Sequence, residues 1–152
     1  MYISFINNNN NNNNKDIYFT QEYGKVCEYS DNAMWECCIY KDLQYVYLKK
    51  PYKFENKIYY DLITPYGYSG YQYENQNTFN EFIPIFREEA KKRNYLTEVV
   101  RQNPYINLTT HVNMRDKYSI ITQKYIFAVK LSNYSNLGNY LLCCHRDNKR
   151  GY

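Results

Sequence analysis

The segment Asp61-Leu62-Ile63-Thr64-Pro65-Tyr66-Gly67-Tyr68-Ser69-Gly70 carries an apolar strand pattern directly into a turn. Pro65 has a fixed φ that suits a turn, and it biases the preceding residue toward an extended conformation. The two glycines of the turn can adopt positive φ, or can let a backbone or a ligand approach where a side chain would clash. The two tyrosines add aromatic faces and hydroxyls. These residues fit either a hairpin corner packed by aromatic side chains or a loop shaped for a ligand.

Strand patterns precede this turn. Lys57–Thr64 alternates between two faces and is the clearest strand in the sequence, and Leu43–Lys49 alternates in the same way. Lys25–Ser30 and Ala33–Tyr40 flank Asp31-Asn32, which indicates two strands joined by a tight hairpin turn. Strands joined by short turns favour an antiparallel meander.

A helical pattern follows the turn. Apolar side chains recur at helical spacing within Thr78–Arg93 and predict one buried stripe, made of Phe79, Phe82, Ile83, Phe86 and Ala90. Strand patterns return at Tyr95–Arg101 and within Tyr118–Leu131. The sequence therefore predicts an α+β fold, with one or two helices packed on a mixed, mostly antiparallel sheet.

The chain of 152 residues is long enough for one domain with its own core. Asn7–Asn14 is a low-complexity run that buries nothing apolar, so we expect residues 1–15 to be disordered and residues 16–152 to form the folded lobe. No segment resembles a secretory signal or is apolar enough to span a bilayer, which predicts a cytoplasmic protein without a membrane partner. The end of the chain carries no closing apolar element, so we expect a truncated lobe.

Charge and cysteine content narrow the function classes only slightly. With 19 basic and 15 acidic residues the net charge is +4, too small by itself to indicate a nucleic-acid binder. The 21 tyrosines favour a sheet, since tyrosine is a strand former. The five cysteines include no CxxC pair, so their spacing argues against a zinc site and favours free thiols in a reducing compartment. A zinc site in this chain would have to use Cys37, Cys38, Cys143, Cys144 and His145.

Several stretches together resemble one family. Tyr60–Gly70 resembles the D-x-x-T-P-Y-G-Y-G-G segment of FemAB-like acyltransferases in the GNAT (acyl-CoA N-acyltransferase) superfamily. Glu98–Asn107 resembles the family's strand that ends in Arg, two residues and Pro, with Asn shortly after. The helix Thr78–Arg93, the strand Ile126–Ser132 and the basic segment Asp147–Arg150 fall where the family has corresponding elements. The resemblance covers about Asp16 to the end, and Ser69 and Gln102-Asn103 depart from the family pattern.

The resemblance implies a GNAT-like mixed sheet that carries helices. The family joins an acyl or aminoacyl group to an amine, takes acyl-CoA or aminoacyl-tRNA as donor, and holds no permanently bound cofactor. Its acceptors include small-molecule amines and the sugar-peptides of cell envelopes. The family normally has two lobes and this chain matches the first, so we expect a second lobe or a homo-oligomer to complete the cleft.

Acyl transfer to an amine requires a proton acceptor and hydrogen-bond donors for the oxyanion. Asp61, next to the turn, and Glu98 are the candidate catalytic carboxylates. Arg101 could clamp a phosphate or carboxylate of the substrate. The other candidate substrate-binding residues are Tyr66, Gly67, Tyr68, Gly70 and Asn103. No nucleophile and base occur at a recognisable spacing, which disfavours a covalent mechanism, and no metal ligand set is predicted.

Three functions therefore remain open. The first is an N-acyltransferase lobe. The second is a non-catalytic relic of that fold that keeps a ligand pocket. The third is an aromatic-rich nucleic-acid-binding module, because Lys and Arg are interleaved with Tyr.

Overall fold

A computed structural model describes residues 2–7, 16–101 and 118 of the chain. In chain order the elements are β1 (Ser4–Ile6), η1 (Ile17–Phe19), α1 (Gln21–Asp31), β2 (Met34–Tyr40), β3 (Leu43–Phe54), β4 (Lys57–Ile63), β5 (Gly70–Gln72), α2 (Gln76–Lys92) and β6 (Tyr95–Val99). The fold is α+β, and its six-stranded sheet is mixed and mostly antiparallel, as the sequence predicts.

The long strand β3 organises the sheet, whose order is β1-β2-β3-β4-β6. Its first part, Leu43–Lys49, pairs with β2, and its second part, Leu48–Phe54, pairs with β4. The short strand β5 pairs with Gln44–Val46, along the same edge of β3 as β4 but over the stretch that β4 does not reach. The pairs are antiparallel except β4 with β6, which is parallel because α2 connects the two strands.

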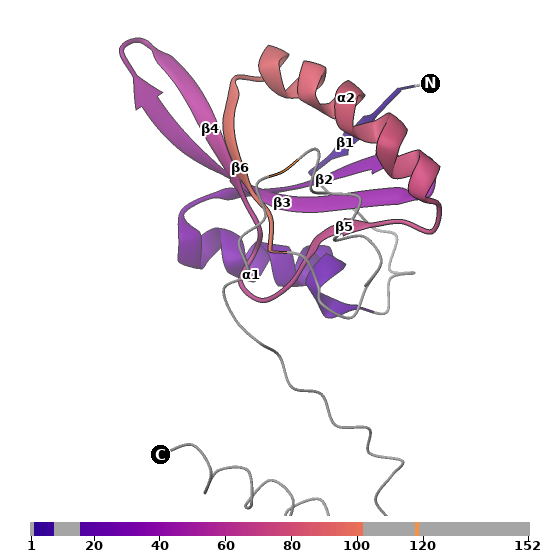
Figure 1. Cartoon of the computed structure of the whole chain (residues 1–152). Coiled ribbons are helices and arrows are strands. Elements are labelled where there is room, and N and C mark those ends of the chain that lie inside the picture. The colour runs from indigo at the N-terminus through magenta and orange to yellow at the C-terminus, as the bar shows by residue number, and fades with distance from the viewer. Residues whose placement is uncertain (1, 8–15, 102–117, 119–152) are drawn as a thin grey trace, which may run out of the picture. The chain divides into compact units, whose positions relative to one another are not determined.

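The helices cover opposite faces of the sheet (Figure 1). On the α2 face, tyrosines of β3 and β5 pack against the phenylalanines of α2, and Tyr45 stacks on Tyr71 with ring centroids 4.1 Å apart. On the α1 face, Trp35, Val46 and Leu48 form a smaller core. Strand alternation sends Tyr45 to one core and Val46 to the other.

The prediction of a strand over Lys25–Ser30 is wrong, because these residues lie within helix α1. Thr20 caps the helix by accepting a hydrogen bond from the Tyr23 amide, and Asn32 ends it in the left-handed conformation at φ 50°. Asp31-Asn32 is therefore a helix end and not a hairpin turn. Gly24 lies buried against the Trp35 ring, where a Cβ would lie 1.9 Å from Cδ1, so the helix packs closely on the sheet.

The other predicted elements within the described residues are confirmed with small shifts. The helix predicted over Thr78–Arg93 spans Gln76–Lys92, with Asn75 as its N-cap and Pro84 inside it. Ser4–Ile6 pairs with β2, so these residues are part of the sheet although we placed them in a disordered segment. The strand predicted within Tyr118–Leu131 lies outside the described residues apart from Tyr118.

The turn after β4 packs as a corner against η1 and α1. Gly67 has φ +90°, and a Cβ there would lie 2.3 Å from Cε1 of Tyr18. The Tyr18 and Tyr68 rings meet edge to face with centroids 6.3 Å apart. The Tyr23 hydroxyl donates a hydrogen bond to the Tyr66 carbonyl at 2.5 Å. This geometry matches the first of the two interpretations of the turn, a corner packed by aromatic side chains.

Substitution Gly67→Ala should lower the free energy of unfolding by about 1–3 kcal/mol, because alanine is strained at positive φ and its Cβ meets the Tyr18 ring. Urea denaturation measures the change. Combining it with Tyr18→Ala separates the two causes: the backbone strain should persist after the ring is removed. Equal stability of Gly67→Ala and the parent chain would contradict the described turn.

Candidate functional site

A groove of about 450 Å³ lies between α2 and β6. Apolar side chains of Leu62, Phe86 and Ala90 line it together with the charged side chains of Arg87 and Lys91. The remaining lining residues are Pro84, Glu88, Tyr95, Leu96, Thr97 and Glu98. Glu98, predicted from the sequence as a catalytic carboxylate, is thus at a hollow with both apolar and cationic walls.

Two tyrosine hydroxyls hold the Glu98 carboxylate. Tyr71 of β5 donates to Oε1 at 2.5 Å and Tyr118 donates to Oε2 at 3.0 Å. The two hydroxyl oxygens lie 2.5 Å from each other. The Glu98 carboxylate is therefore anchored by hydroxyl groups from β5 and from Tyr118, next to the groove.

The phenols around Glu98 stay protonated at neutral pH. Burial raises the pKa of Tyr71 and of Tyr45 well above the ordinary tyrosine value, and the negative charge of Glu98 raises both further. Burial also raises the pKa of Tyr118, again with Glu98 as the second cause. These side chains are hydrogen-bond donors to the carboxylate and not bases themselves.

A second carboxylate, Glu36 of β2, lies on the same face and is only 1 % exposed. Its Oε1 accepts a hydrogen bond from Lys49 Nζ at 2.6 Å. Its Oε2 accepts from the hydroxyls of Tyr47 at 2.5 Å and Tyr95 at 2.7 Å. Arg93 Nη1 lies 4.0 Å from Oε1. Tyr95 also lines the groove, so this cluster forms part of its wall.

Sequence reasoning missed Glu36, although a signal for it was present. The residue stands in the apolar strand Trp35-Glu36-Cys37-Cys38 on the face that points into the main core. A charged residue at such a position must be paired if the strand is buried. The partners Lys49 and Tyr95 come from other strands, so only the sheet pairing identifies them.

The two predicted catalytic carboxylates lie on opposite faces of the sheet. Glu98 pairs in register with Leu62 and shares its face, whereas the neighbouring residue Asp61 points to the other side. There Asp61 accepts a hydrogen bond from Thr97 Oγ1 at 2.6 Å. Asp61 and Glu98 therefore do not form one site.

A register shift explains why Tyr95 and Glu98, both in β6, face the same side of the sheet. The strand advances two residues, from Tyr95 to Thr97, while β4 advances one, from Tyr60 to Asp61. This bulge restores the α2 face for Glu98 three residues after Tyr95, where strict alternation would put them on opposite faces.

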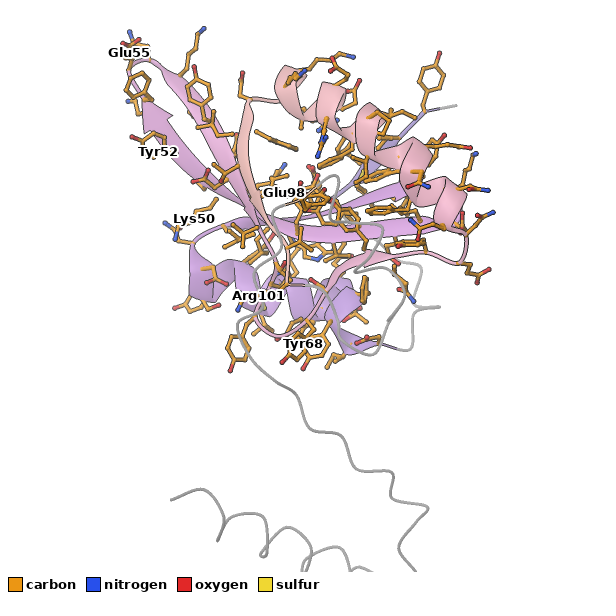
Figure 2. The ribbon with its side chains drawn as sticks, viewed as in Figure 1. Lys50, Tyr52, Glu55, Tyr68, Glu98 and Arg101 are labelled. Carbon is orange, nitrogen blue, oxygen red and sulfur yellow. The ribbon has the colours of Figure 1, made fainter. Side chains whose placement is uncertain are left out.

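The predicted substrate-binding residues Tyr66, Gly67, Tyr68 and Arg101 belong to the turn after β4 or contact it, and Figure 2 labels Tyr68 and Arg101. The Arg101 amide donates to Thr64 Oγ1 at 2.7 Å and its guanidinium donates to the Thr64 carbonyl at 3.2 Å, so Arg101 fastens the turn. Tyr66 is 75 % exposed, while Gly67 and Tyr68 pack toward Tyr18.

Gly70 pairs with Val46 and immediately precedes Tyr71, which contacts Glu98. Asn103 lies outside the described residues.

The adjacent cysteines of β2 cannot converge on one ligand, because Cys37 faces the α1 core and Cys38 faces the α2 core. Burial raises the pKa of the Cys37 thiol to about 12, and it raises that of Cys38 as well. Both thiols are therefore protonated at neutral pH. Cys143, Cys144 and His145 lie outside the described residues. Among the helices that the structure describes, none is long and apolar enough to cross a membrane.

No protein-family model, curated protein or solved structure matches this chain. The residues that the structure describes establish an α+β fold, in which two α-helices pack on a mixed sheet. The resemblance to FemAB-like enzymes therefore remains one of sequence, carried mainly by the turn after β4 and by the segment around Arg101.

Substitution Glu36→Ala should lower the free energy of unfolding by about 3–5 kcal/mol, because it leaves the Lys49 ammonium partly buried without its partner. Urea denaturation measures this loss. Glu88→Ala, which removes an exposed pair with Lys91, is the matched control and should change stability little. A loss below about 1 kcal/mol for Glu36→Ala would contradict the described ion pair.

The raised tyrosine pKa values predict alkaline destabilisation. Tyrosines in the unfolded chain lose their protons near pH 10, whereas Tyr45 and Tyr71 in the folded chain keep theirs to much higher pH. Their contribution to stability is thus fully present below about pH 10 and is lost as the pH rises above it.

Tyr71→Phe should reduce the slope of unfolding free energy against pH by about 1.4 kcal/mol per unit above pH 10. Urea unfolding at a series of alkaline pH values measures that slope. Tyr29→Phe, at a helix position that is 95 % exposed, should leave it unchanged. Parallel pH profiles for Tyr71→Phe and the parent chain would argue against a buried Tyr71 hydroxyl.

Proposed function

We propose that this chain is a lobe of an N-acyltransferase that transfers an acyl or aminoacyl group to an amine, with Glu98 as the proton acceptor. The observation that carries the proposal is the Glu98 cluster, in which the hydroxyls of Tyr71 and Tyr118 hold a carboxylate beside the groove. The resemblance of Tyr60–Gly70 to FemAB-like enzymes supplies the reaction class.

The reaction needs an amine that attacks the donor carbonyl carbon. As the new C–N bond forms, the amine nitrogen gives up a proton, and Glu98 receives it. The bond from carbonyl carbon to the donor's sulfur or oxygen then breaks, and the leaving group departs with the electron pair and is protonated from solvent. An amine held in the groove would have Glu98 as its hydrogen-bond acceptor, which is the geometry that general base catalysis requires.

The walls of the groove suit an acyl donor. Leu62, Phe86 and Ala90 offer an apolar surface for an acyl chain, and Arg87 and Lys91 of α2 place two cations for the phosphates of acyl-CoA or of an aminoacyl-tRNA end. β6 stands at the end of the sheet order in the described residues, and the backbone amides of a strand at an edge can serve as oxyanion donors.

A second candidate is a non-catalytic ligand-binding relic of this fold. It is favoured by the roles of Arg101 and Gly67, which fasten and shape the turn through contacts within the chain. In that case the groove binds a donor or an amine and no transfer follows.

The test is transfer from acyl-CoA, and separately from aminoacyl-tRNA, to a panel of amines, with the N-acylated product detected by mass spectrometry. Glu98→Gln should lower kcat by about 100-fold or more, since general base catalysis contributes that much or more. Asp61→Asn is the matched control, because Asp61 lies on the other face of the sheet, and its kcat should stay near the parent value.

Two outcomes would overturn parts of this proposal. Unchanged kcat in Glu98→Gln would remove Glu98 as the proton acceptor. Stabilisation of the chain by acyl-CoA in a thermal-shift assay without any product would favour the non-catalytic relic. Loss of that stabilisation in Arg87→Ala would locate the donor in the groove.

A further inference from the structure

The end of the β3–β4 hairpin is a two-stranded ribbon that projects from the body of the fold (Figure 1). β2 covers β3 only as far as Lys49, and β6 covers β4 only from Tyr60 onward. Every residue from Pro51 to Ile58 is exposed. The ribbon therefore packs on no other element of the described residues, although it carries three large apolar side chains that are more than half exposed.

One face of this ribbon carries a row of aromatic rings. Tyr52 pairs in register with Tyr59, and Phe54 pairs with Lys57, so these four side chains share a face. Tyr52 is 52 % exposed and Phe54 is 55 % exposed. Lys50 lies on the same face one pair closer to the body (Figure 2). The face thus presents aromatic rings between a lysine at each end.

The charge of the ribbon is positive. Lys50, Lys53 and Lys57 carry three positive charges, and Glu55 in the turn carries one negative charge. Asp61, opposite Lys50 in the strand pair, adds a second negative charge at the base of the ribbon. Lysines alone would be explained by protection of an exposed strand pair against edge-to-edge aggregation. That role does not explain the exposed rings, which would promote association instead.

We propose that this ribbon face binds single-stranded nucleic acid. Aromatic side chains stack on bases regardless of sequence, and neighbouring lysines neutralise the phosphates. Tyr52 and Phe54 are two residues apart in a strand, about 6.8 Å, roughly twice the rise between stacked bases. Bases seated on them would be unstacked, as in single strands and not in a duplex. No ribbon residue from Lys50 to Tyr59 lines the groove at Glu98, so this inference is independent of the proposed acyl transfer.

The test is fluorescence anisotropy of labelled oligouridylate, oligothymidylate and a duplex of equal length, each titrated with the chain over a series of salt concentrations. The single strands should bind more tightly than the duplex. Tyr52→Thr combined with Phe54→Thr keeps strand-forming residues, and it should weaken single-strand binding about tenfold or more. Tyr52→Phe keeps the ring and should retain binding.

The lysines give a separate readout. Replacing Lys50 and Lys57, the two lysines of this face, by Gln should lower the slope of log affinity against log salt concentration by about 1.4, because each single-strand phosphate contact contributes about 0.7. The matched control combines Tyr29→Ala, Lys25→Gln and Lys92→Gln, at positions in the two helices, and should bind as the parent does.

Several outcomes would overturn the proposal: no binding to either single strand at low salt, equal affinity for the duplex, or parent-like binding by the ribbon variants. Sedimentation of the chain alone tests the alternative that a second copy of this chain binds the ribbon. Self-association that Tyr52→Thr abolishes, in a chain that binds no oligonucleotide, would assign the ribbon to contact between copies of this chain.

Discussion

Burial of the Glu36 carboxylate constrains how the described elements of this fold meet. A carboxylate that is 1 % exposed requires compensating hydrogen bonds and charge. Tyr47 and Lys49 provide them from β3, Tyr95 from β6, and Arg93 from the end of α2. Lys49 and Tyr47 reach Glu36 through the pairing of β2 with β3. Tyr95 and Arg93 reach it because the chain returns after α2, so their contacts link the position of β6 to the buried carboxylate.

The same return of the chain creates the groove. Once Tyr95 is held at Glu36, the bulge in β6 turns Glu98 toward the α2 face, where Tyr71 and Tyr118 meet it. α2 then closes the other wall with Phe86 and Arg87. Two carboxylate clusters, one deeply buried and one beside the groove, are therefore linked through a single short strand. Because the first cluster is deeply buried, we expect it to serve stability. The second cluster lies beside the groove, where we propose that it serves chemistry.

Much of the fold could be predicted because its signals are local. The alternation in Leu43–Lys49 and the stripe of Phe79, Phe82 and Phe86 each report burial on one side of a single element, and β3 and α2 follow from them. The helix α1 was missed because its signal is weak: it buries only Gly24 and Cys27. Its position depends on the Thr20 cap and on a close fit to Trp35, which is a tertiary contact.

The candidate site, like the fold, was predicted from the sequence only in part. The sequence by itself determined the α+β class, the aromatic turn after β4 and Glu98 as a carboxylate worth testing, because these depend on residue type and short-range pattern. Only the tertiary structure decided that Asp61 faces away from Glu98, that Arg101 fastens the turn, and that Glu36 and Tyr71 belong near the groove. Those facts depend on strand register and on one bulge, since a shift of a single residue moves every side chain of a strand to the opposite face.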